Sequence, residues 1–257
     1  LLFKYTTCIP ASTINSPDVS LYDHLRMTAA LAVCLYDVRQ SEEKPENPFL
    51  LIGADLSGIQ SYIYQVVSKY AGKNLKGRSF YLRILSDSIV RVLLKELGLF
   101  QANVVYNSGG GFYMIAPDTT ATKARLEKAV KKIEQQLFKI HGTALFVAID
   151  SVPVSKDALI HANGENLQKV WKELFEKREQ KKCAKFASQI EEHYEAFFMS
   201  IEHDDTVGRD VVTGEDFLPG EKYVSEGELK PLKQITKDQI VLGRVLRESE
   251  IMVISTE

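Results

Sequence analysis

The chain has 257 residues, which is enough for one or two domains, and its 32 basic residues nearly balance its 34 acidic ones. The net charge of −2 argues against a uniformly basic nucleic-acid coat and against an acidic tail. No apolar run approaches the ~18–20 residues that span a membrane, and the opening residues are too polar for a signal peptide. The three cysteines are far apart and form no CxxC pair. We therefore expect a cytoplasmic, reducing compartment and no disulfide framework or zinc ribbon.

Residues 1–38 end in a helical pattern, for which Asp18 or Ser20 is the expected N-cap. The next residues, 39–48, are polar and contain two prolines, a composition typical of a linker. Because the chain opens without a Met and in the middle of a pattern, we expect it to be a piece of a longer protein.

The clearest unit in the sequence covers residues 49–154. Its first part predicts a buried strand, a helix, a basic loop that contains glycines, and a second helix. These elements are expected at 49–54, from Ser57 onward, at 71–79 and from about Ser79 to Leu97, with Gly98 ending the second helix.

Two strands follow at 103–107 and 112–117, and the glycines between them are a strong hairpin signal. A long helix then has apolar residues at steps of four and three through 126–140, and a strand is expected at 144–150. The order of elements predicts an α+β fold of the ferredoxin-like, split βαβ type, as in palm domains. Its antiparallel sheet has the first and third strands in the centre.

The rest of the chain predicts helices separated by polar segments. Residues 164–202 indicate one or two helices with an apolar stripe around Trp171, which is more typical of a core than of a ligand site. The remaining elements are a turn-rich segment at 203–235, a helix at 236–248 capped by Thr236, and a strand at 250–255.

The first strand ends in Asp55, at the end of the sheet where the hairpin between the middle strands also lies. Palm domains that transfer nucleotides hold two Mg²⁺ ions there with several carboxylates. Here the hairpin has Gly109, Gly110 and Gly111 and no acid, and a single carboxylate does not hold two hard cations well. We infer a catalytically degenerate palm whose glycines still allow a nucleotide to approach. The alternative, which spacing alone favours, is that Asp55 caps the next helix and the glycines only form a turn.

Residues 69–95 carry seven basic side chains and one acid. Within this stretch, Lys76 and Arg78 flank a glycine before an expected helix start, and two cations at a helix N-terminus suit a phosphate group. The alternative is a solvated basic loop, which is the commoner role of such residues. The acidic stretch 202–216 is expected to be a solvated loop.

His24 lies at the head of the first helical pattern, where a lone histidine is more often a core or cap residue than a metal ligand. The other four histidines have no ligand spacing. The sequence contains no phosphate-loop, dinucleotide-binding or nucleophile-elbow motif.

Several segments together resemble one known family, the large signature subunit of type III-A CRISPR (Csm) effector complexes. Each segment alone is modest support, but five in this order over most of the chain are specific. They are DVSLYDHLRMTAALA (18–32), GADLSGIQSYIY (53–64), LKGRSFYLRILSD (75–87), NSGGGFYMIAP (107–117) and QIVLGRVLRESEIMVI (239–254).

The resemblance implies a full protein with an HD-type nuclease domain, two palm domains, a zinc-bearing insertion and a helical C-terminal domain. Target RNA that pairs with the guide RNA switches on cleavage of single-stranded DNA and synthesis of cyclic oligoadenylates from ATP. The implied domains are a C-terminal remnant of a permuted HD domain at 1–38, a linker at 39–48, the first palm at 49–154, a helical insertion in place of the zinc-bearing module at 155–235, and the lead-in to a missing second palm at 236–257.

The family's second palm carries a GGDD hairpin for Mg²⁺, and NSGGGF stands in the corresponding place here. ATP with Mg²⁺ or Mn²⁺ is implied for the full protein, whereas zinc is doubtful because the cysteine pairs of the insertion are missing. The resemblance makes His24 part of an incomplete HD metal site, since the HD dyad is not in this chain. The implied nucleotide contacts are Asp55, Ser57, Gly58, Gln60, Lys76, Arg78, Gly109, Gly110 and Gly111.

We therefore expect this chain to be inactive alone and to supply the non-catalytic palm half of an ATP pocket. Its expected partners are ATP, the other subunits of the complex and, indirectly, guide and target RNA, with no membrane. One alternative is an RNA-recognition-like module in which Phe112 or Tyr113 stacks on a base. The other is a scaffold that only docks neighbouring subunits.

Overall fold

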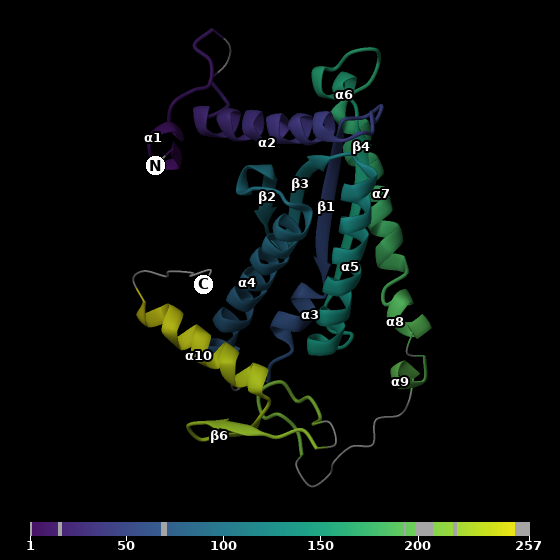
Figure 1. The fold of residues 1–257 in the computed structure, drawn as a ribbon. Coiled ribbons are helices and arrows are strands. Elements are labelled where there is room, and N and C mark those ends of the chain that lie inside the picture. Colours follow the sequence, from purple (N-terminus) through teal and green to yellow (C-terminus); the bar gives the residue numbers. More distant parts are fainter. Residues whose placement is uncertain are drawn as a thin grey trace. The chain divides into compact units, whose positions relative to one another are not determined.

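Figure 1 shows the computed structural model of the chain, which describes residues 2–14, 17–67, 71–192, 194–198, 208–217 and 220–249. The chain forms two compact units that interleave along the sequence. Unit 1 consists of Leu1–Ser57, Ser86–Ile140 and Phe146–Lys185, and unit 2 of Gly58–Leu85, His141–Leu145 and Phe186–Glu257. Among the described residues, no helix is both long enough and apolar enough to cross a membrane.

Unit 1 is built on a four-stranded sheet in the order β2-β3-β1-β4, with every neighbouring pair antiparallel. This confirms the predicted α+β, ferredoxin-like arrangement, in which the first and third strands are central. The strands are β1 (Phe49–Ser57), β2 (Val104–Ser108), β3 (Gly111–Pro117) and β4 (Phe146–Val154).

Successive side chains of β1 point to opposite faces of the sheet. Phe49 and Leu51 belong to a core cluster with residues of α2 (Leu21–Gln40) and α7 (Leu167–Cys183). The intervening apolar residues of β1 are also buried. They face α5 (Thr120–His141) and the part of α4 (Ala71–Leu97) that belongs to unit 1, which lie along the other side of the sheet (Figure 1). The sheet is therefore covered on both faces. The smaller helices of unit 1 are α1 (Leu2–Thr6), the 3-10 turn η2 (Gln101–Asn103) and α6 (Lys156–Ile160).

Local signals place the ends of these elements where the sequence predicts them. The Ser20 hydroxyl accepts a hydrogen bond from the Asp23 N–H at 3.0 Å, so Ser20 is the N-cap of α2. Helix α4 ends at Leu97, before Gly98 with φ +69°. The two residues between β2 and β3, Gly109 and Gly110, have φ of +63° and +85°, as a tight type I′ hairpin turn requires.

Helix α7 packs unusually close to the sheet at Gly53. A Cβ atom at this position would lie 2.7 Å from Leu174 Cδ2 and 3.1 Å from the ring of Tyr113. Leu174 is fully buried, and Trp171 packs edge-on against Tyr113 with ring centroids 4.6 Å apart. The glycine therefore leaves the space that α7 occupies.

Unit 2 is centred on the contact between residues 71–85 of α4 and α10 (Gln234–Glu248). A Cβ atom on Gly77 would lie 1.9 Å from the backbone oxygen of Gln239, so the two helices cross with their backbones in contact. The other elements are α3 (Ile59–Tyr64), α8 (Ala187–Glu192), α9 (Tyr194–Phe198) and the hairpin of β5 (Val224–Glu226) and β6 (Leu229–Leu232).

The buried carboxylate of Asp210 holds together the irregular part of unit 2. It accepts hydrogen bonds from the backbone N–H groups of Val212 and Thr213 at 2.9 Å and of Lys233 at 2.7 Å. The sequence predicts a solvated acidic loop here. Instead, the Asp210 carboxylate binds this segment to the start of α10.

Several expected boundaries are wrong. Helix α3 has only six residues, and the expected basic loop at 71–79 forms the first turns of α4. Helix α2 continues to Gln40, into the expected linker. The region 164–202 contains three described helices, α7, α8 and α9, not one or two.

Two further differences concern the C-terminal part. Lys233 is the N-cap residue of α10, and Thr236 lies buried inside its first turn. The β5–β6 hairpin has too few residues to stand out in a turn-rich sequence. The strand expected at 250–255 lies outside the described residues.

The close packing at Gly53 can be tested by a double-mutant cycle. Gly53→Ala is expected to lower the free energy of unfolding by about 1–3 kcal/mol through overpacking, and Leu174→Ala by about 2–5 kcal/mol through a cavity. Because Leu174→Ala removes the closest atom that the new methyl group meets, the double variant should lose less than the sum of the two in urea unfolding. Additive losses would contradict the described packing.

The buried His141 predicts a pH dependence of stability. Its Nε2 lies 3.0 Å from the Tyr81 hydroxyl, and burial, aided by the charge of Arg78, lowers the pKa of the imidazole from 6.5 to about 4. The unfolded chain therefore binds a proton below pH 6.5 that the folded chain does not. At pH 5 this destabilises the fold by about 2 kcal/mol relative to pH 7.

His141→Gln keeps a hydrogen-bonding group near Tyr81 but cannot titrate. In urea unfolding, this variant should lose about 2 kcal/mol less than the unmodified chain between pH 7 and pH 5. Equal losses for the two proteins would show that His141 is not held neutral.

Candidate functional site

The structure places Asp55 beside the glycine turn, as the sequence predicts. In the β1–β3 register Asp55 is opposite Gly111, and the Leu56 N–H donates a hydrogen bond to the Gly110 oxygen at 2.9 Å. A Cβ atom on Gly111 would lie 3.4 Å from the Ala54 oxygen and 4.0 Å from Asp55 Oδ1. The missing side chain therefore leaves space directly next to the carboxylate.

Asp55 does not cap the following helix. The N-cap residue of α3 is Gly58, and no side chain makes the cap hydrogen bond. Instead, the Asp55 carboxylate forms an ion pair with the ammonium group of Lys182, near the end of α7. The alternative interpretation, in which Asp55 serves as a helix cap, is therefore wrong.

Lys182 is shared between two carboxylates. It also contacts Glu179 at 2.6 Å, one turn earlier on α7. Burial by itself lowers the pKa of Lys182, but the hydrogen bonds and charges of Asp55 and Glu179 outweigh it and raise the pKa. Lys182 thus stays charged at neutral pH and balances the charge of Asp55.

Three other basic residues of α7 reach the backbone of the sheet. Lys177 donates to the Ser151 oxygen at 3.1 Å and Lys181 to the Ile149 oxygen at 2.6 Å, both on the edge strand β4. Arg178 is nearly buried, donates to the Ala54 oxygen at 3.3 Å and lies 5.1 Å from the centroid of the Tyr113 ring. These contacts anchor α7 along the end of the sheet where Asp55 lies.

Sequence reasoning missed this role of α7. Its basic residues are spaced so that they share one helical face, which is the available signal. The same spacing is typical of any solvated helix rich in Lys and Glu, so the signal alone does not identify a contact with the sheet.

The residues around Asp55 do not fit a pair of Mg²⁺ ions. Two hard cations require several carboxylate oxygens, whereas Asp55 is a single carboxylate already paired with Lys182. Within the part of the chain that the structure describes, no three His, Cys, Asp or Glu side chains form a group that could hold a metal ion. His24 is exposed on α2.

The next expected contacts along the chain have different surroundings. Ser57 is the last residue of β1 and pairs with Phe146. In unit 2, Gly58 has φ +92°, and a Cβ atom there would lie 2.2 Å from the Ala144 oxygen, so only glycine fits. Gln60 is exposed on α3.

Arg78 lies in the interior of α4 and is 3% exposed. Its Nε donates to the Tyr62 oxygen at 2.9 Å, its Nη1 donates to Gln239 Oε1 at 3.3 Å, and the guanidinium lies 4.2 Å from the centre of the Tyr62 ring. Burial lowers the pKa of Arg78 and raises that of Tyr62. The guanidinium therefore joins α3, α4 and α10 within unit 2.

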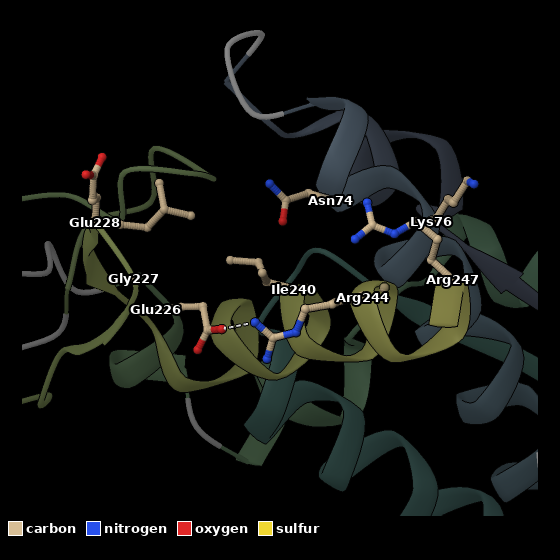
Figure 2. Close-up of a pocket in the computed structure, with 10 residues that line it drawn as sticks. Asn74, Lys76, Glu226, Gly227, Glu228, Ile240, Arg244 and Arg247 are labelled. Carbon is tan, nitrogen blue, oxygen red and sulfur yellow. Dashed lines mark hydrogen bonds and ion pairs between the residues drawn. The ribbon is translucent and has the colours of Figure 1, made fainter. Parts of the chain in front are cut away.

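Lys76 and Arg78 do not lie at the expected helix start, because both residues follow the first turn of α4. The buried guanidinium of Arg78 is already bound to Tyr62 and Gln239. Lys76 is exposed and lines a cavity of about 690 Å³ within unit 2, shown in Figure 2.

The geometry does not support base stacking on β3. Phe112 is 1% exposed, and the Tyr113 ring packs against Trp171 and, at 6.2 Å, against Tyr106. Because α7 covers this part of the sheet, neither ring is open for a base to stack on. The structure therefore does not support the RNA-recognition-like alternative.

A family model for Csm1 subunit domain B matches residues 48–199, more than half of the chain. The chain belongs to this family. Similar curated proteins are named as the CRISPR system single-strand-specific deoxyribonuclease Cas10/Csm1 of subtype III-A. The protein from Methanocaldococcus jannaschii is 32% identical over 90% of this chain and 33% of its own length. The protein from Thermococcus onnurineus is 38% identical over 65% of this chain and 22% of its own length. This chain thus spans about a third or less of these relatives.

Solved structures of Csm1 have the same fold. A Csm1-Csm4 cassette in complex with cA4 is 34% identical, with a TM-score of 0.65, over 72% of this chain and 26% of the solved one. A cassette in complex with AMPPNP is 29% identical, with a TM-score of 0.66, over 91% and 36%. These matches confirm the resemblance found in the sequence.

The ion pair between Asp55 and Lys182 predicts a measurable coupling energy. In a cycle of Asp55→Asn and Lys182→Met, we expect a coupling of about 0.5–1 kcal/mol in urea unfolding, which falls in 1 M NaCl. The control is the more exposed pair Lys172–Glu176 on the same helix, whose charged atoms lie 3.9 Å apart. A coupling no larger than that of the control would contradict the described pair.

Proposed function

We propose that unit 1 is the first palm of a type III-A CRISPR large subunit and forms the non-catalytic side of a nucleotide pocket. The observation that carries this proposal is the position of Asp55, which lies beside an open glycine turn and is paired with Lys182. The proposed contacts in unit 1 are Asp55, Ser57 and the turn Gly109–Gly111. Solved Csm1-Csm4 cassettes in complex with one ATP and with AMPPNP support the choice of ligand.

The chemistry of this site favours binding over catalysis. The backbone at Gly110 and Gly111 can approach a ligand closely because no side chain stands in the way. Metal-assisted transfer requires carboxylates for two cations, whereas Asp55 and Glu179 share one ammonium group at this site and, among the described residues, belong to no group that could hold a metal ion. Mg²⁺ or Mn²⁺ would have to come with the nucleotide or be held by residues outside this site.

For the full protein, we propose a subunit of the type III-A effector complex that cleaves single-stranded DNA and makes cyclic oligoadenylates once target RNA is bound. The names of the curated relatives support the nuclease activity. The cassettes solved with Csm4 and with cA4 support both a docking role for this chain and a link to the cyclic product. On this proposal the chain alone has neither activity.

The test is calorimetric titration of the purified chain with ATP, followed by incubation with ATP and Mg²⁺ or Mn²⁺ and separation of the products. We expect binding without any adenylate product. Gly111→Val, whose Cβ has room beside Ala54 and Asp55, should fill the space for the ligand and weaken binding at least tenfold. Lys172→Gln on the exposed side of α7 is the control and should bind normally.

Two results would contradict this proposal. Equal ATP affinity in Gly111→Val and the unmodified chain would remove the glycine turn from the site. Metal-dependent formation of linear or cyclic adenylates by the chain alone would show that the site is catalytic.

A further inference from the structure

Unit 2 carries a groove between α4 and α10 that the nucleotide site described above does not use. Two cavities make up this α4–α10 groove, of about 690 and 610 Å³, and both are lined by Lys76 and Arg247. Each alone has the volume of a small-molecule pocket. Because they share two lining residues, the two cavities lie next to each other.

The α4–α10 groove is basic where the two cavities meet. In Figure 2, Lys76 from α4 and Arg247 from α10 lie close together at one end of the larger cavity. The smaller cavity is also lined by Arg83 and by no acidic residue. Within the part of the chain that the structure describes, the acidic partner of Arg247 is its exposed neighbour Glu248, at 3.4 Å. Lys76 and Arg247 thus place two cations where the cavities meet, although the chain as a whole is slightly acidic.

The acidic residues of the groove lie at its other end. Glu226 is paired with Arg244 at 2.7 Å, and Glu228 projects from the β5–β6 hairpin on the side away from Lys76 (Figure 2). The charge therefore changes along the groove, which favours an anionic ligand at the shared, basic part.

Aromatic and apolar side chains line the basic part. Tyr64, at the end of α3, is 71% exposed, and it lines the smaller cavity together with Phe80 and Leu246. An exposed aromatic ring beside phosphate-binding cations is the arrangement on which single-stranded nucleic acids stack their bases. An acidic peptide would bind the cations, but its carboxylates would gain nothing from stacking on the aromatic ring.

The spacing of the cations suits more than one phosphate. Lys76 and Arg83 are seven residues apart on α4, which corresponds to about 10 Å along the helix. Consecutive phosphates of a stacked strand are about 3.4 Å apart along the axis. A short single-stranded nucleic acid can therefore place several phosphates along α4 while one of its bases reaches Tyr64.

We propose that the α4–α10 groove binds single-stranded nucleic acid, with the phosphates on Lys76, Arg83 and Arg247 and a base stacked on Tyr64. The buried Arg78 belongs to the scaffold beneath this groove and does not contact the ligand. The proposal is independent of the nucleotide site in unit 1, because the two share no residue.

The test is fluorescence anisotropy of labelled eight-residue oligouridine and oligothymidine with the purified chain at 50 and 200 mM salt. Lys76→Glu and Arg247→Glu should each weaken binding at least tenfold and lower the salt dependence, because each removes a phosphate contact. Tyr64→Ala should weaken binding about tenfold through lost stacking.

The matched control is Lys172→Glu, the same charge reversal on an exposed lysine of unit 1, which should change affinity less than twofold. Circular dichroism and urea unfolding check that each variant is folded.

The outcomes separate the possible ligands. Preference for oligouridine would support RNA and its 2′-hydroxyls, and equal affinity would support recognition of backbone and bases common to RNA and DNA. The proposal is overturned if neither strand binds at low salt or if Lys172→Glu weakens binding as much as the groove variants. It is also overturned if polyglutamate competes as well as the oligonucleotides and Tyr64→Ala has no effect, because the groove would then fit an acidic protein.

Discussion

The close approach of α7 to β1 is the constraint on which the site in unit 1 depends. It is possible because Gly53 has no side chain, so that Leu174 and the Tyr113 ring occupy the space above the strand. With the helix seated there, its last turn brings Lys182 to Asp55. Arg178, Lys177 and Lys181 then bind backbone oxygens of the sheet. The absence of a side chain at Gly53 thus allows the ion pair between Lys182 and Asp55 at the end of β1.

On the proposed function, the charge balance of this ion pair accounts for a palm-like sheet that binds a nucleotide without catalysing a reaction. An unpaired cluster of carboxylates at this end of the sheet would attract divalent cations. In this chain the hairpin turn consists of glycines and carries no acid, and an ammonium group is paired with the Asp55 carboxylate. The site keeps the open backbone that a nucleotide needs and lacks the ligands that two-metal chemistry needs.

The sheet could be predicted from the sequence because its signals are local. Alternating apolar strands, the double-glycine turn and the helix terminator at Gly98 require little knowledge of distant residues. The sequence predicts a loop where α4 begins, because the glycines of this segment are typical of loops. Gly77 is instead required by the backbone of α10, more than 160 positions away, and Arg78 by Tyr62 and Gln239. Lys182 could not be assigned to Asp55 for the same reason, since only tertiary packing brings the two together.

The central claim is that Asp55 belongs to a nucleotide site and holds no metal. The most direct measurement is a crystal structure of the chain soaked with ATP and Mn²⁺, with anomalous data that locate manganese. The account predicts nucleotide density beside Asp55 and the Gly109–Gly111 turn, with Asp55 still paired to Lys182 and no anomalous peak within coordination distance of its carboxylate. A manganese peak on Asp55, with Lys182 displaced, would contradict it.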